Sequence, residues 1–204
     1  MILKRELDKG KVQELLKIFP VAAILGARQC GKTTLAGQIP FDHYFDLENP
    51  RSLARLDNPQ LALEELEGCI VIDEVQRKPD LFSLLRYLVD TNAKQKYLIL
   101  GSASKELLRQ SSDSLAGRIG YYHLGGFSLY DIGRENFKTL WLRGGFPPAY
   151  LAATDKDSNL WRENYITTFL ERDIPKLGHI HSCRVIAAFL DDAQPLPRSD
   201  YKLL

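Results

Sequence analysis

The glycine-rich segment LGARQCGKTTL (Leu25–Leu35) constrains the fold of this chain more than any other feature. It contains the pattern G-x-x-x-x-G-K-T, which ends in Gly31, Lys32 and Thr33. In such a loop, glycines let backbone N–H groups approach phosphate oxygens, the lysine neutralises the β- and γ-phosphates, and the hydroxyl binds Mg²⁺. A structural glycine turn is the alternative. The apolar run VAAIL (Val21–Leu25) predicts a strand before the loop and a helix is expected after it, a context that favours phosphate binding.

The predicted nucleotide-binding residues form one continuous segment: Gly26, Ala27, Arg28, Gln29, Cys30, Gly31, Lys32, Thr33 and Thr34. Within it, Lys32 is the expected phosphate clamp. The Cys30 thiol has two interpretations. Near a helix N-terminus it could be acidified and open to oxidation, or it could be a small filler residue.

Carboxylates for a metal and for water activation are expected at the end of a second apolar run, CIVIDE (Cys69–Glu74). Asp73, with Thr33, is the predicted magnesium site, and Glu74 is the predicted base that activates the attacking water. The alternative is a strand that ends in solvated acids. A third strand ends in LILGSAS, where Ser102 is the candidate sensor of the γ-phosphate and Ser104 could instead cap a helix.

The order of apolar segments predicts an α/β fold. Strands are expected at 21–25, 43–48, 69–73, 96–102 and 118–124, and helices at about 3–18, 31–39, 50–67, 79–92 and 104–117. Strands that alternate with helices favour a parallel sheet with right-handed crossovers. From about residue 131 onward only helical segments are predicted. Their aromatic residues, Trp141, Trp161, Tyr165 and Phe169, are expected to form the core of a small helical subdomain.

Composition excludes few functions. Basic and acidic residues number 27 and 26, so charge gives no support for a nucleic-acid partner. No secretion signal or membrane-spanning run is visible, and the scattered Cys30, Cys69 and Cys183 suggest reduced thiols, so we expect a cytoplasmic protein. The segment HIHSC (His179–Cys183) has no second ligand cluster, which disfavours zinc. Guanine-recognition motifs are missing, and ATP with Mg²⁺ is therefore the expected ligand pair.

Several segments together resemble a widespread family of predicted bacterial and archaeal AAA-type P-loop ATPases. They are FPVAAILGARQCGKTTLAGQI, YFDLENP, VIDEVQRKPDLFSLLRYLVD, LILGSAS, SLAGR, RGGFPPAY and YITTFLERDI. The resemblance implies a five-stranded parallel sheet of order 5-1-4-3-2, ATP binding through Gly31 to Thr34, and hydrolysis with Asp73 and Glu74. In this family a C-terminal nuclease-like domain of unknown function follows the ATPase core.

The resemblance also implies a role for Arg118, at the end of SLAGR. Its guanidinium could contact phosphate within the chain, reach the nucleotide of a neighbouring copy in a homo-oligomer, or only pair with helix-end carbonyls or a surface acid. We predict a P-loop ATPase core over residues 1–130, an incomplete helical subdomain over 131–190 and an aberrant or disordered tail over 191–204. The expected cause of this ending is a truncated gene, a frameshift or a fragment that lacks its natural C-terminal partner domain.

The predicted function is Mg²⁺-dependent binding and hydrolysis of ATP, with Lys32, Glu74, Ser102 and Arg118 as the catalytic set. One alternative is a nucleotide-gated scaffold or regulator with little or no turnover. A small-molecule kinase is a weaker one, since kinases of that kind more often use other acidic pairs.

Overall fold

A five-stranded sheet forms the centre of the computed structural model, which describes residues 3–102, 109, 111 and 113–173. All strand pairs are parallel and the order is β2-β3-β4-β1-β5, which is the predicted order read from the other edge. The prediction of an α/β P-loop sheet is therefore confirmed. The strands are β1 (Val21–Leu25), β2 (His43–Asp46), β3 (Gly68–Asp73), β4 (Gln95–Gly101) and β5 (Ile119–His123).

Helices connect these strands and continue after the last one. Before β5, the helices whose bounds are described are α1 (Glu6–Ile18), α2 (Lys32–Ala36), α3 (Pro50–Arg55), α4 (Pro59–Leu63) and α5 (Leu81–Thr91), with a 3-10 turn at Val75–Arg77. Residues 113–115 are also helical. After β5 come α7 (Leu129–Ile132), a 3-10 turn at Arg134–Asn136, α8 (Phe137–Arg143), α9 (Pro147–Tyr150), α10 (Asp155–Thr168) and a π-helical turn at Phe169–Asp173. Among the described residues, no helix has the length and apolarity to span a membrane.

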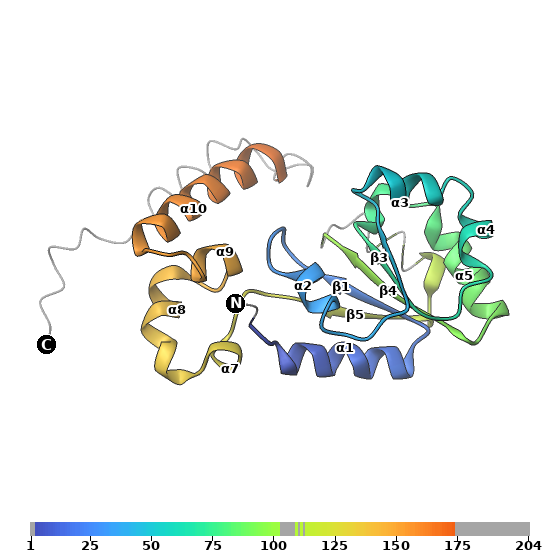
Figure 1. The fold of residues 1–204 in the computed structure, drawn as a ribbon, viewed down its shortest axis with the longest axis horizontal. Coiled ribbons are helices and arrows are strands. Elements are labelled where there is room, and N and C mark those ends of the chain that lie inside the picture. The colour runs from blue at the N-terminus through green and yellow to red at the C-terminus, as the bar shows by residue number, and fades with distance from the viewer. Residues whose placement is uncertain (1–2, 103–108, 110, 112, 174–204) are drawn as a thin grey trace, which may run out of the picture. The chain divides into compact units, whose positions relative to one another are not determined.

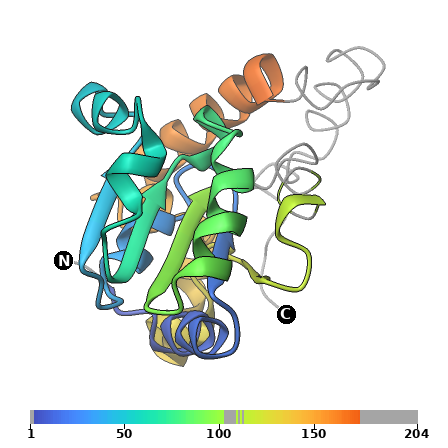
Figure 2. The ribbon, with the colours of Figure 1, turned by 90° about the vertical axis from the view of Figure 1, so that its right-hand side faces the viewer.

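Both faces of the sheet are covered, which explains why β1 is apolar at every position. Val21, Ala23 and Leu25 belong to one hydrophobic cluster, which includes apolar side chains of α5. Ala22 and Ile24 belong to a second cluster, which includes residues of α1 and α2. Figure 1 shows these layers, and Figure 2 shows α1 end-on below the strands. Such double burial is typical of the central strands of a parallel sheet.

The single helix predicted over 50–67 is wrong, because the structure divides this stretch into α3 and α4. Each of the two helices begins with an Asn-Pro pair. The side chain of Asn49 accepts a hydrogen bond from the Arg51 backbone N–H, and that of Asn58 accepts one from Leu61. Pro59 disfavours helical backbone at the residue before it, which ends α3 and starts α4.

The expected core position of Trp141 is also wrong. Its side chain is 82% exposed, and none of the seven residues of α8 is buried. Helical spacing of aromatic residues cannot tell a buried helix face from an exposed one. Further along, Trp161 stacks on Tyr165, and Tyr165 on Phe169, with ring centroids 4.9 and 6.3 Å apart.

The chain divides into two compact units, residues 1–158 and 159–204. The predicted domain boundary after residue 130 remains a prediction. Four further predictions lie wholly or mostly outside the described residues: Ser104 with much of its helix, the helical segments expected after residue 173, the HIHSC segment and the tail from residue 191.

Candidate functional site

The glycine loop follows β1 at the carboxyl edge of the sheet. Gly31 has φ +99° and Gln29 has φ 60°, so the backbone enters the left-handed region twice within the loop. Gly26 lies against the neighbouring strands, and a Cβ at this position would be 2.5 Å from the Leu124 carbonyl oxygen. These constraints explain both glycines of the G-x-x-x-x-G-K-T pattern: Gly31 is required by its backbone conformation and Gly26 by close packing.

Lys32, the first residue of α2, is buried and folds back over the loop. Its Nζ donates hydrogen bonds to the carbonyl oxygens of Gly26 and Ala27, both at 3.0 Å. Among the ion pairs found in the described part of the chain, none includes Lys32. Burial removes much of the water that would solvate an ammonium, and neutral acceptors offset this cost less than a counter-charge would. This environment favours an anion.

Thr33 and Asp73, the two predicted magnesium ligands, are hydrogen-bonded to each other. The Thr33 hydroxyl donates to Oδ2 of Asp73 at 2.6 Å, and the Glu74 backbone N–H donates to Oδ1 of the same carboxylate at 2.9 Å. Asp73 ends β3 and is only 4% exposed. Glu74 follows it with φ 55° and ψ 42°, a left-handed conformation that is uncommon for a residue with a side chain.

A cavity of about 530 Å³ joins the loop to the end of β3. Its lining residues are Arg28, Gln29, Gly31, Lys32, Thr33, Thr34, Glu48, Glu74, Pro147 and Pro148. The cavity thus brings together most of the predicted binding residues and the predicted base. It also includes residues that the sequence did not indicate, Glu48 after β2 and the two prolines of α9.

Other predicted residues lie beside this cavity. Gly26 and Ala27 contribute the carbonyls that hold Lys32. Cys30 is buried in the core, and burial raises the pKa of its thiol, although Lys32 and Arg5 act in the opposite direction. The structure therefore favours the filler interpretation of Cys30. Ser102 directly follows β4, whose last residue Gly101 accepts a hydrogen bond from the Gly26 N–H.

Arg118 lies at the opposite edge of the sheet. It precedes β5, and its carbonyl oxygen accepts from the N–H of Val21, the first residue of β1. The loop follows the last residue of β1, so the length of the strand, roughly 15 Å, separates the two. The guanidinium bonds to the Asp90 carboxylate at 2.6 and 2.9 Å, and this contact lowers the pKa of Asp90. Among the three interpretations of Arg118, the structure displays the surface pair.

Two side chains that the sequence did not indicate contact the predicted acids. The Tyr44 hydroxyl donates to Oδ2 of Asp73 at 2.9 Å, and the Gln76 amide donates to Oε2 of Glu74. Burial, helped by the nearby Asp73 carboxylate, raises the pKa of Tyr44. The Tyr44 contact follows from no local motif, since Tyr44 reaches across from a different strand, whereas Gln76 is only two residues from Glu74.

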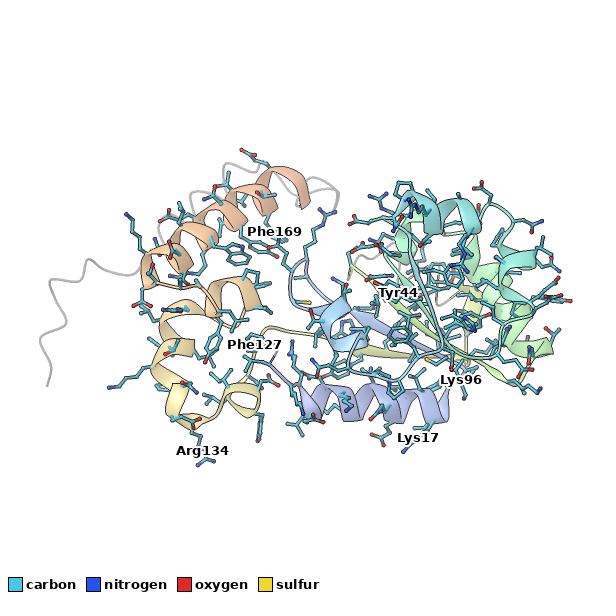
Figure 3. All side chains as sticks on the ribbon, in the orientation of Figure 1. Lys17, Tyr44, Lys96, Phe127, Arg134 and Phe169 are labelled. Atoms are coloured by element: carbon cyan, nitrogen blue, oxygen red, sulfur yellow. The ribbon has the colours of Figure 1, made fainter. Side chains whose placement is uncertain are left out.

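A second, mostly apolar cavity of about 170 Å³ lies behind the loop. It shares Gly31, Thr34 and Pro147 with the first cavity, and its other lining residues are Leu3, Arg5, Cys30, Gln38, Phe127 and Leu151. Figure 3 labels Phe127, whose ring lies 5.5 Å from the guanidinium carbon of Arg5. Arg5 is buried and donates to the carbonyl oxygens of Cys30, Gly125 and Gly126 at 3.0–3.3 Å.

The oxygen ligands present suit a hard cation that retains water. Thr33 and Asp73 supply a hydroxyl and a carboxylate, and the described residues contain no group of three or more His, Cys, Asp or Glu that could hold a metal alone. Magnesium is usually held by one or two protein oxygens together with substrate phosphates and water, so the residues present fit it.

Comparison with protein families gives two matches. A family described as AAA domain matches residues 19–133, and a domain of unknown function, DUF8612, matches residues 134–192. Uncharacterized proteins of Mycobacterium bovis and Mycobacterium tuberculosis are each 46% identical over 182 residues. The alignment covers 87% of this chain but 41% of each relative, so the chain spans less than half the length of these relatives.

Among solved structures, the Walker-type ATPase PABY2304 of Pyrococcus abyssi is similar, with a TM-score of 0.58 and 18% identity. The match covers 97% of this chain and 86% of that protein. At this identity the similarity shows a shared fold.

Proposed function

The chain belongs to the AAA domain family of P-loop ATPases, and from this membership we propose that it binds ATP with Mg²⁺ and hydrolyses its β–γ bond with water. The observation that carries the proposal is the environment of Lys32. Within the described part of the chain, its buried ammonium bonds to two carbonyl oxygens, and Lys32 lines a cavity together with Thr33 and Glu74. A positive charge, a hydroxyl and a carboxylate are the groups that phosphate, metal and water require.

Phosphate binding is assigned to the loop and to Lys32. The ammonium is held in place by the Gly26 and Ala27 carbonyls and lines the cavity, so it can bond to phosphate oxygens without a large rearrangement. Such charge-assisted hydrogen bonds are about twice as strong as neutral ones. Binding of an anion would also place a counter-charge beside the buried ammonium.

The metal site is assigned to Thr33 and Asp73, which already bond to each other. The Thr33 oxygen can bind a metal while its O–H still donates a hydrogen bond to the Asp73 carboxylate. When bound, Mg²⁺ would neutralise charge on the β- and γ-phosphates. Asp73 would orient the Thr33 hydroxyl and bond to water of the metal.

Water activation is assigned to Glu74. Its left-handed backbone places it immediately after the Asp73 carboxylate, and it lines the same cavity as Lys32. The Glu74 carboxylate would accept a proton from water as the water oxygen bonds to the γ-phosphorus. The bond from phosphorus to the bridging oxygen then breaks, and ADP and inorganic phosphate are released. The Gln76 amide, bonded to Glu74, fixes the direction of that carboxylate.

Adenine binding is assigned to the apolar cavity behind the loop. Thr34 lines both cavities, so a nucleotide whose phosphates lie on the loop has its base within reach of Phe127, Pro147 and Leu151. Planar bases pack well against aromatic and apolar side chains. This arrangement, together with the missing guanine motifs, supports ATP.

The proposal is tested by comparing the wild-type protein with Lys32→Ala and Glu74→Gln. We expect Glu74→Gln to lower the rate of phosphate release by about 100-fold or more, since a general base contributes 10²–10⁴-fold. Its affinity for ATP should stay within about twofold of wild type, because phosphate contacts are unchanged. Phosphate release is measured with a coupled assay, and affinity by titration with a fluorescent ATP analogue.

Three outcomes would contradict or redirect the proposal. A wild-type protein that releases phosphate no faster than Glu74→Gln is not an ATPase. If that protein still binds ATP, and captures a partner only in the ATP-bound state, it is a nucleotide-gated scaffold or regulator. A phosphorylated acceptor in place of free phosphate would indicate a small-molecule kinase.

A further inference from the structure

Tyr44 lies where the edge strand of the sheet approaches the candidate metal site. In the parallel pair of β2 and β3, Tyr44 is opposite Val71 and Asp46 is opposite Asp73. Paired residues of adjacent strands point to the same side of a sheet, and side chains two residues apart share a face. Tyr44 and Asp73 therefore lie on one face. Val71 belongs to the hydrophobic cluster of α1 and α2, which identifies this face as the one that carries Thr33.

The phenol hydroxyl completes a set of three donors on one buried carboxylate. Oδ2 of Asp73 accepts from Tyr44 at 2.9 Å and from Thr33 at 2.6 Å, while Oδ1 accepts from the Glu74 backbone N–H at 2.9 Å. Bonds to both oxygens define the rotation of the carboxylate plane as well as its position. The Glu74 N–H belongs to the same turn as Asp73, so within the described part of the chain Tyr44 and Thr33 are the donors that anchor this group from other elements.

We propose that Tyr44 is a positioning residue of the magnesium site, because its hydroxyl holds the Asp73 carboxylate in the orientation that receives Thr33 and the metal's water. The inference rests on the proposed function. Groups that orient a metal-binding residue from behind typically contribute 10–100-fold to metal affinity. Without the phenol, Oδ2 keeps a single side-chain donor, Thr33, which is itself a proposed metal ligand. Of the three donors, Thr33 and the Glu74 N–H would remain, so the orientation of the carboxylate would be less firmly fixed.

The surroundings of the ring argue against a role in packing alone. Tyr44 is 36% exposed, and its ring meets that of Phe41 at a centroid distance of 5.8 Å and an angle of 42°. Figure 3 shows Tyr44 beside the strands. A phenylalanine would keep this contact and the same carbon surface. What distinguishes tyrosine here is one O–H donor, directed at a carboxylate that is almost fully buried.

The test measures ADP affinity with and without Mg²⁺ in wild type, Tyr44→Phe and the control Tyr87→Phe, which removes an exposed phenol on α5. In EDTA, Tyr44→Phe should bind a fluorescent ADP analogue within about twofold of wild type, because the loop is intact. Mg²⁺ is then titrated at a fixed ADP concentration. The Mg²⁺ concentration that gives half of the increase in ADP binding should be about tenfold higher in Tyr44→Phe than in wild type. Tyr87→Phe should match wild type in both measurements.

Several results would overturn the assignment. One is an unchanged Mg²⁺ midpoint in Tyr44→Phe. A second is a loss of ADP affinity in Tyr44→Phe that is equal with and without Mg²⁺, and a third is a Tyr44→Phe protein that fails to fold. Each of these would mean that the hydroxyl supports the fold rather than the metal site. If Mg²⁺ does not tighten ADP binding even in wild type, the proposed metal site fails and Tyr44 fails with it. If Mg²⁺ tightens ADP binding in wild type and only the prediction for Tyr44→Phe is contradicted, the proposed function stands and the role of Tyr44 does not.

Discussion

Two cations at the carboxyl edge of the sheet, Lys32 and Arg5, are buried and bond to backbone carbonyls, whereas two at the amino edge, Arg118 and Lys94, are more exposed and pair with acids. Lys32 and Arg5 each contact two or more carbonyl oxygens of the loops after β1 and β5. At the other edge, Arg118 pairs with Asp90 and Lys94 pairs with Glu67, and each of these side chains is about a third exposed or more.

This difference separates charges that serve a site from charges that solvate a surface. Exposed ion pairs typically contribute less than about 1 kcal/mol to stability, because water and salt screen them. Burying a charge costs several kcal/mol, so a protein retains it where it shapes a loop or receives a ligand. The comparison predicts that substitutions at the two edges change ATP affinity or the free energy of unfolding by different amounts. For Lys32, the change in the free energy of unfolding is also expected to have the opposite sign.

The largest effect is expected at Lys32. Lys32→Met should lower the affinity for ATP by about 100-fold or more, since it removes charge-assisted bonds worth about 1.5–3 kcal/mol each. The free energy of unfolding of the nucleotide-free protein should stay level or increase, because a buried ammonium without a counter-charge is replaced by an apolar chain. Nucleotide titration and urea unfolding measure the two quantities.

The matched control for this substitution is Lys94→Met at the amino edge, where the ammonium is exposed and bonds to Glu67 at 2.7 Å. It should leave ATP affinity unchanged. If Lys32→Met binds ATP as well as Lys94→Met does, the carboxyl edge is not a phosphate site.

A second large effect is expected at Arg5, where the loss is in stability. Its guanidinium bridges the carbonyls of Cys30, Gly125 and Gly126 and pairs with Asp8 at 2.6 Å. Arg5→Leu strands these groups, so the free energy of unfolding should fall by about 3 kcal/mol. Arg5→Lys should fall short of wild type as well, since one ammonium cannot reproduce a planar fork of donors.

Urea unfolding measures these losses, with Lys9→Met as the control on α1, the helix that Arg5 precedes. Lys9 makes a more exposed pair with Glu6 at 3.7 Å, and its removal should cost less than about 0.5 kcal/mol. Similar losses for Arg5→Leu and Lys9→Met would mean that the guanidinium does not tie α1 to the loop.

The sequence predicted the parallel sheet and the loop because these depend on local patterns. A five-residue apolar strand followed by glycines and a lysine can be recognised without tertiary contacts, and the resemblance added the strand order. The meeting of Thr33 and Asp73 fits the same order, since the loop before Thr33 follows β1 and Asp73 ends β3, and both strands end at the carboxyl edge of the sheet.

The residues that the sequence did not indicate act across long separations. Tyr44 approaches Asp73 from another strand, Arg5 bonds to carbonyls 120 and 121 residues later, and Pro147 joins the cavity from α9. Strand alternation shows which face Tyr44 occupies, but only the register and the length of its side chain bring the hydroxyl to the carboxylate. Trp141 failed for a related reason, since spacing does not encode exposure.

The smallest effect is expected at Arg118, whose guanidinium pairs with Asp90 far from the loop of its own chain. Arg118→Ala should leave ATP affinity unchanged and lower stability only slightly. The pair lowers the pKa of Asp90 in the folded protein. Its contribution is therefore present above the ordinary aspartate pKa and is lost as pH falls and Asp90 becomes protonated, so the unfolding curves of variant and wild type should converge in acid.

Phosphate release, measured over a range of protein concentrations, separates this surface role of Arg118 from a role in a neighbouring copy. Equal rates at every concentration support the surface pair, whereas a deficit that grows with concentration would place Arg118 at the nucleotide of another chain.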